Sequence, residues 1–200
     1  MDRHDTLIRW KEAIGDYSDK ALTQAAQALS RLTGETVTVE NASIEIVNPD
    51  EALQIVQNKA DSLTIIKHSI DGKIAGDILL VISSDQTNIL IEHVMTQGSL
   101  GGVDDEVRNS VLGELGNVVS SSYITVMGDS FSTILLPTVP QMLYVQKPDD
   151  IGLLLGNGKH SYDYALMLEN DFFVGDDRVR IYFLFLISRE PGDVFSSGLS

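Results

Sequence analysis

The chain has 200 residues and carries 14 Lys and Arg against 29 Asp and Glu, a formal net charge of −15 at pH 7. With 43% apolar residues, a chain of this length removes roughly 70% of its unfolded surface from water, so we expect a globular protein. The acidic excess repels phosphate backbones and anionic headgroups, which argues against nucleic-acid and membrane-surface binding. The absence of cysteine excludes disulfides, thiolate zinc sites and cysteine nucleophiles.

No signal-like segment follows Met1, and the apolar runs 78–82 and 181–187 are too short to span a bilayer. We therefore expect a soluble cytoplasmic protein without membrane insertion. The histidines lack the spacing of metal ligands, so we expect no metal site of the protein's own. They are His4, His68, His93 and His160.

The first half of the chain predicts a helix, a short strand, a short helix, a hairpin and a further helix. Gly34 suits the left-handed position just past the end of the first helix, and Asn48 or Asp50 can cap the second. Asp71-Gly72 is typical of a tight hairpin turn, and Ser84-Asp85 can cap the last helix. The predicted elements are 7–32, 36–39, 49–57, 63–70 with 73–83, and 84–94.

The second half repeats this order after a glycine-rich link at 98–102. A long helix is predicted at 103–127, opened by acidic residues that suit a helix N-terminus. A second hairpin follows at 162–169 and 177–188, with Gly175 in its loop. The closing strands even share letters, because 79–83 reads LLVIS and 184–188 reads LFLIS.

This self-similarity predicts an α/β (α+β) fold with a pseudo-twofold axis, in which two αβ units share a mostly antiparallel sheet and two long helices lie on one face. Each half has too few apolar strands to cover both faces of a sheet alone. We therefore expect a single domain over 1–200, with a first repeat at 1–97, a second at 103–188 and a loosely ordered tail at 189–200.

The second long helix separates into two stripes at about 100° per residue. Ser110, Glu114, Asn117 and Ser121 are spaced four, three and four, so they stack on one face and place an acid one turn from an amide. A solvated polar face is the plain interpretation of such a stripe. The apolar stripe, expected to face the core, contains Val107, Val111, Leu112, Leu115, Val118 and Val119.

A longer pattern favours a functional interpretation. Ser110-x3-Glu114-x2-Asn117 is followed after 22 residues by Pro140, and this resembles the signature [DS]-x3-E-x2-N-x22-P of the CheC, CheX and FliY chemotaxis phosphatases. All four positions match. CheC is also similar in length and is built from two such halves, so the resemblance covers the chain and implies a CheC-like fold.

The first half carries an altered copy of this motif. Moving the motif back by 98 residues reaches Glu12, Asp16, Asp19 and Ala42, so the Glu is shortened, the amide is a carboxylate and the proline is missing. A carboxylate in place of the amide would repel a phosphoryl group. We therefore expect the first site to be degenerate and inactive, with a role in symmetric packing.

The resemblance implies a hydrolase that accelerates loss of the aspartyl phosphate from the response regulator CheY, which supplies its own Mg²⁺ and lysine. Asn117 would position the attacking water, since an amide accepts and donates hydrogen bonds without titrating. Glu114 would anchor the regulator through its lysine. Ser110 would leave room for the partner, and Pro140 would fix a bend.

Two other functions remain open from the sequence. The chain could be a non-enzymatic adaptor, resembling the flagellar switch proteins or binding the deamidase CheD, and binding of CheD is also compatible with a phosphatase. A generic ligand-binding domain would need a pocket with convergent polar groups, which the sequence does not show.

Overall fold

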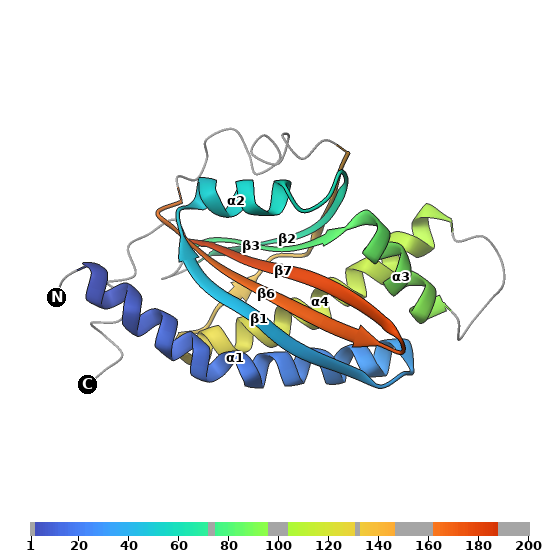
Figure 1. Ribbon diagram of the computed structural model, residues 1–200, viewed down its shortest axis with the longest axis horizontal. Helices are drawn as coiled ribbons and strands as arrows, with labels where there is room; N and C mark the ends of the chain where they lie inside the picture. Colours follow the sequence, from blue (N-terminus) through green and yellow to red (C-terminus); the bar gives the residue numbers. More distant parts are fainter. Residues whose placement is uncertain (1–2, 72–74, 96–103, 131–132, 147–161, 188–200) are drawn as a thin grey trace.

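The computed structural model describes residues 3–71, 75–95, 104–130, 133–146 and 162–187. Their helices and strands follow one another as α1 Arg3–Thr33, β1 Val37–Val47, α2 Pro49–Gln57, β2 Leu63–Asp71, β3 Gly76–Ser83, α3 Ser84–Met95, α4 Asp105–Ser130, β4 Leu136–Pro137, β5 Gln141–Val145, β6 Tyr164–Val174 and β7 Asp177–Ile187 (Figure 1).

The strands form one seven-stranded sheet in the order β1-β6-β7-β3-β2, with β4 and β5 pairing in turn with the outer side of β2. Each pairing among the described strands is antiparallel. The order shows an exchange between the halves of the chain, since β1 of the first half pairs with β6 of the second, and β5 of the second pairs with β2 of the first. Each half therefore completes its edge with a strand from the other.

The two halves meet at the central pair β3 and β7. Leu79 lies opposite Leu184 in this pair, and these are the equivalent positions of the two similar strand sequences. Both side chains are fully buried. Because both faces of these strands are covered, their sequences are continuous apolar runs rather than alternating ones. The predicted fold class is confirmed, including the pseudo-twofold arrangement and the shared antiparallel sheet.

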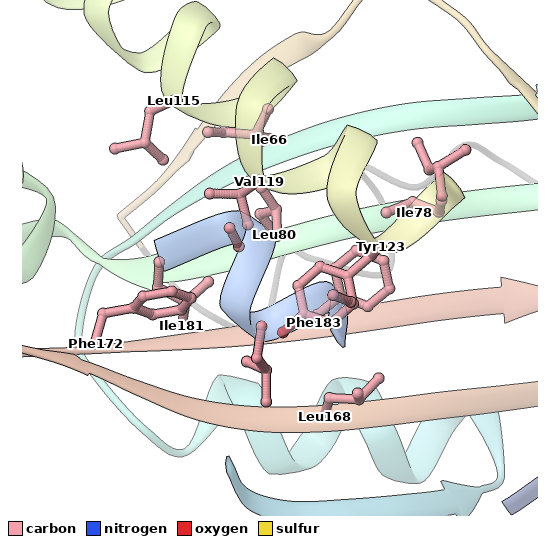
Figure 2. Packing of buried hydrophobic residues seen from close by; sticks show 14 of the residues in the cluster. Ile66, Ile78, Leu80, Leu115, Val119, Tyr123, Leu168, Phe172, Ile181 and Phe183 are labelled. Carbon is pink, nitrogen blue, oxygen red and sulfur yellow. The ribbon is translucent and has the colours of Figure 1, made fainter. Parts of the chain in front are cut away.

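Helices cover both faces of the sheet (Figure 1). α1 and α4 pack side by side on one face, with α3 beside them, and α2 lies on the opposite face over its own apolar cluster. In the larger cluster the ring of Tyr123 from α4 stacks on Phe183 from β7 with their centroids 4.2 Å apart (Figure 2). The two long helices therefore lie on one face, as the sequence predicts.

The spacing of 98 residues relates the buried sides of α1 and α4. Positions that are buried in α1 recur as buried positions in α4, although α1 supplies mainly alanine and α4 larger side chains. The small α1 side chains let the helices approach one another while the larger ones fill the space above the sheet. The pairs are Ala21 and Val119, Ala25 and Tyr123, Ala26 and Ile124, Ala28 and Val126, and Leu29 and Met127.

Several local predictions need correction. The first strand continues to Val47, because its full length pairs with β6 across an irregularity between Asn41 and Ser43. Ile70 pairs with Gly76, so the β2–β3 connection is longer than an Asp71-Gly72 turn. Ser83, not Ser84 or Asp85, caps α3, because its hydroxyl accepts a hydrogen bond from the backbone N–H of Gln86 at 3.3 Å.

Most other predictions agree with the structure or fall outside it. Gly34 and Gly175 have φ of 71° and 57°, the left-handed conformation expected at these positions. Asn48 caps α2 by accepting a hydrogen bond from the backbone N–H of Asp50 at 2.9 Å. The prediction that Val107 faces the core is wrong, because this residue lies in the first turn of α4 and is exposed. The link at 98–102 and the tail at 189–200 lie outside the described residues, so the domain boundaries stay a prediction.

Gly116 sets the distance between α4 and the sheet. A Cβ atom at this position would lie 2.5 Å from Cγ2 of Ile66, a fully buried residue of β2. A Cβ atom at Gly113, one turn earlier, would meet only the flexible end of Met142 at 3.7 Å. Only glycine at position 116 therefore allows the helix to approach the sheet this closely.

We expect Gly116→Ala to lower the free energy of unfolding by about 1–2 kcal/mol, because overpacking against Ile66 costs more than alanine gains as a helix former. Gly113→Ala is the matched control and should be neutral or stabilising by about 0.5–1 kcal/mol. Urea unfolding at neutral pH measures both. A Gly116→Ala protein as stable as Gly113→Ala would contradict this account of the packing.

His93 of α3 links both halves of the chain. Its Nδ1 lies 2.7 Å from Glu35, just after α1, and its Nε2 lies 3.0 Å from Asp177 at the start of β7. Burial alone would lower the pKa of His93, but the hydrogen bonds and charges of the two carboxylates outweigh it and raise the pKa above 6.5. The charged imidazolium is therefore the form that the fold favours.

A raised pKa predicts stabilisation that is fully present below pH 6.5 and lost as the pH rises through the higher pKa of the folded state. We expect His93→Gln to be less stable than wild type by about 1 kcal/mol near pH 5.5, since the carboxylates are partly exposed and screened, and by less near pH 9. Thermal or urea unfolding across this range measures the difference. A difference that does not change with pH would show that His93 stabilises the fold without its charge.

Candidate functional site

The polar stripe of α4 lies on the surface, as its spacing predicts. Ser110, Glu114, Asn117 and Ser121 are exposed, while Leu115 and Val119 on the opposite side are fully buried. Asp104 starts the helix, because its carboxylate accepts a hydrogen bond from the backbone N–H of Val107 at 2.8 Å. The buried side anchors the helix on the sheet (Figure 2), so the stripe is presented by a rigid element.

A hollow of about 470 Å³ lies beside this stripe. Asn117 contributes to the wall formed by α4, and Pro140 contributes to the facing wall, which is the segment leading into β5. The structure thus brings together the last two positions of the motif, although 22 residues separate them. Glu114 and Ser110 lie further along the stripe and do not line this hollow. Its remaining lining residues are His68, Val118, Ser120, Ser121, Ile124, Pro137, Thr138 and Val139.

The wall that contains Pro140 is held by three hydrogen bonds between Thr138 and β2. The backbone N–H of Thr138 donates to the carbonyl of Ser69 at 2.9 Å. The N–H of Ser69 donates to the hydroxyl of Thr138 at 3.0 Å. Nδ1 of His68 lies 3.0 Å from the carbonyl of Thr138. Pro140 follows this fixed point, so its place beside α4 is set by strand β2.

His68 is a site residue that the sequence analysis missed. Its side chain is 2% exposed, and it occupies a position of β2 between Ile66 and Ile70, which are both buried. A histidine between two isoleucines of the same strand face is the signal that could have marked it, because a buried polar side chain needs a partner or a function. Its distance in sequence from the motif concealed the connection.

A groove of about 290 Å³ flanks α4 on its other side, where it meets α1. Gln24 and Arg31 of α1 line it together with Ser121 and Thr125 of α4. The exposed stripe of α4 therefore runs between two depressions, one against the β4–β5 segment and one against α1.

The altered motif copy occupies α1 and β1. Asp19 is exposed on α1, at the position equivalent to Asn117, but it lines neither depression beside α4. Glu12 and Asp16 belong to α1, and their side chains lie outside the described part of the structure. Ala42 lies in β1 at the irregularity of its pairing with β6, where the second copy has Pro140.

The exposed stripe carries an unpaired charge. Within the described part of the chain, no basic side chain forms an ion pair with Glu114. The described residues also contain no group of three His, Cys, Asp or Glu side chains that could hold a metal ion. None of the described helices has the length and apolar character needed to cross a membrane.

Comparison with known proteins connects this site to a family. Residues 108–144 match the model of the CheC-like family, a segment that begins in α4, contains all four motif positions and ends in β5. The chain is 22% identical over 121 residues to the CheY-P phosphatase CheC of Bacillus subtilis (strain 168). That match covers 59% of this chain and 58% of the curated relative.

Solved structures share the fold at low sequence identity. FliY from Thermotoga maritima has a TM-score of 0.70 and 13% identity, with 93% of each chain covered. The FliM middle domain from H. pylori has a TM-score of 0.62 and 10% identity, covering 92% of this chain and 95% of that one. The family model falls on the motif helix and the segment facing it, and the curated relative is a CheC, so the chain is similar in this segment to the CheC-like family that its motif resembles.

Proposed function

We propose that this protein accelerates hydrolysis of the aspartyl phosphate of a CheY-type response regulator. The observation that carries the proposal is the exposed pair Glu114 and Asn117 on α4, with Asn117 beside a hollow whose far wall contains Pro140. Asn117 and Pro140 line this hollow, while Ser110 and Glu114 share the exposed stripe of α4 with Asn117. The curated relative acts on CheY-P, which supports the same substrate class here.

The reaction requires positioning more than covalent chemistry. Water attacks phosphorus in line, the bond from phosphorus to the aspartyl oxygen breaks, and the products are the free carboxylate and inorganic phosphate. The amide of Asn117 can accept a hydrogen bond from this water and donate one to a phosphoryl oxygen. It carries no charge, so it approaches the phosphoryl group without repulsion. It does not act as a base, because an amide does not titrate.

Glu114 would orient the bound regulator relative to α4. Its carboxylate lies one turn before Asn117 and is exposed, so it is available to a cation of the partner. We propose that it pairs with the regulator's lysine and so sets Asn117 opposite the phosphoryl group. Ser110, a turn earlier, is small and leaves space for the partner. The Mg²⁺ that accompanies the phosphoryl group belongs to the regulator.

The surface around the stripe suits contact with a protein. Large apolar side chains are exposed along the β4–β5 segment beside the hollow, among them Ile134, Leu136 and Val139. Tyr144 of β5 is half-exposed, and its hydroxyl donates a hydrogen bond to Asn109 of α4. Exposed apolar side chains that gather beside a polar site are typical of interfaces. The same surface would also suit the alternative function of an adaptor.

We expect Asn117→Ala to reduce the accelerated dephosphorylation about 100-fold, because the attacking water loses its positioning group. The variant should fold like wild type, since position 117 is exposed. The measurement is phosphate release from the phosphorylated regulator of the same genome. Thr125→Ala, exposed two turns later on α4 and outside the hollow, is the matched control and should keep wild-type activity.

Asn117→Asp separates charge from size in the same assay and should also be inactive, because it brings a negative charge to the phosphoryl group. If wild type and Asn117→Ala release phosphate at the same rate, the phosphatase proposal fails. An adaptor that binds the regulator or a flagellar component without chemistry would then be favoured.

We expect Asp19→Ala to keep the phosphatase activity near the wild-type value. Asp19 occupies the position of the amide in the first copy, where a carboxylate would repel the phosphoryl group, and it lines neither depression beside α4. The same phosphate-release assay measures this. A loss as large as that of Asn117→Ala would show instead that the first copy is a working site.

A further inference from the structure

Two residues that line the hollow beside Asn117 each contain a buried polar atom without a hydrogen-bond partner among the described residues. These atoms are Nε2 of His68 and Oγ of Ser120. The side chain of Ser120 is fully buried and that of His68 is 2% exposed. Buried polar atoms are nearly always hydrogen-bonded in folded proteins. Two such atoms beside one hollow therefore call for a partner from outside the chain, either a water molecule or a polar group of a bound molecule.

The hydrogen bond of His68 to the backbone determines whether its Nε2 donates or accepts. Nδ1 lies 3.0 Å from the carbonyl oxygen of Thr138, which can only accept, so Nδ1 carries the proton. In the neutral ring Nε2 is then an acceptor. The hydroxyl of Ser120 can donate and accept. The two atoms together thus suit a group that both donates and accepts one hydrogen bond, as a hydroxyl does.

The walls of the hollow are mainly apolar. Val118 and Ile124 of α4 line one side, and Pro137, Val139 and Pro140 line the other. Val139 is 83% exposed at the rim, which continues the apolar surface outward. An apolar body with a polar tip therefore fits the hollow better than a uniformly polar or uniformly apolar group.

We propose that this hollow is a recognition pocket for one side chain of the phosphorylated partner, a tyrosine whose ring lies between the apolar walls and whose hydroxyl donates to Nε2 of His68. The proposal rests on the proposed function, because it assigns the pocket to the same partner. A carboxylate does not donate to Nε2, and an aliphatic side chain leaves both Nε2 of His68 and Oγ of Ser120 unpaired. Tyrosine is also enriched in protein interfaces.

The pocket would act on binding rather than on chemistry. Asn117 lines the same hollow, so a partner side chain bound there would fix the orientation of α4 relative to the partner. His68 is buried and bonded to the backbone of Thr138, so we assign it a role in recognition and not in catalysis. Its loss should raise the regulator concentration at half-maximal rate and leave the maximal rate nearly unchanged.

The first test uses phenol as the probe for the tyrosine side chain, with toluene as the control that lacks the hydroxyl. Both are titrated into the wild-type protein while the imidazole ¹⁵N signals of His68 are followed by NMR. We expect phenol to shift the Nε2 signal and to bind about fivefold more tightly than toluene, the effect of one net hydrogen bond. Equal binding of the two, or no shift at Nε2, would show a water-filled hollow and overturn the proposal.

Two variants test the contribution of Nε2 of His68 to phenol binding. His68→Asn keeps an N–H where Nδ1 donates to Thr138 but removes Nε2, whereas His68→Gln places its amide near the position of Nε2. We expect His68→Asn to lose the preference for phenol and His68→Gln to keep part of it. The wild-type titration decides the proposal even if a variant does not fold.

The second test measures phosphate release at varied regulator concentration. We expect His68→Asn to raise the half-saturating concentration about tenfold with a maximal rate within about twofold of wild type. If Asn117→Ala is inactive but His68→Asn changes neither the half-saturating concentration nor the maximal rate, the proposed recognition pocket is wrong. The proposed phosphatase function would still stand. If Asn117→Ala is fully active, the proposed function fails, and the phenol titration still decides whether the pocket exists.

Discussion

The antiparallel pairing of β3 with β7 is the interaction on which the rest of the molecule depends. Both strands are buried on both faces, and Leu79 lies against Leu184 at the centre of the pair. Removing this surface from water supplies much of the driving force for folding. The pair also fixes where the two hairpins lie, and the hairpins in turn determine the position of the long helices that cover one face.

The site is held in place by strand β2, which contains none of the motif residues. Ile66 of β2 packs against α4 at Gly116. Ser69 and His68 of the same strand form hydrogen bonds with Thr138. Both walls of the hollow are therefore attached to β2, one through packing and the other through hydrogen bonds. This explains how Asn117 and Pro140 keep a fixed relation across 22 residues. A site that is positioned before its partner arrives loses less entropy on binding.

Local patterns predicted much of this fold. The stripe on α4 follows from helical periodicity, and the conformations of Gly34 and Gly175 follow from the turns that they occupy. The motif predicted the position of Asn117 on the surface. The exchange of edge strands was not predictable, because periodicity does not say which strands pair. His68 was missed for the same reason, since its place beside Asn117 comes from pairing between strands distant in sequence.

The exchange of edge strands has a consequence for how the two halves diverge. The first half, whose copy of the motif is altered, still supplies β1, the neighbour with which β6 pairs, just as the second half supplies β5 to β2. Selection for folding alone is then enough to retain it. The two halves therefore relate to one another like the subunits of an obligate heterodimer joined in one polypeptide. The second half can change its site, while the first half remains necessary for the fold.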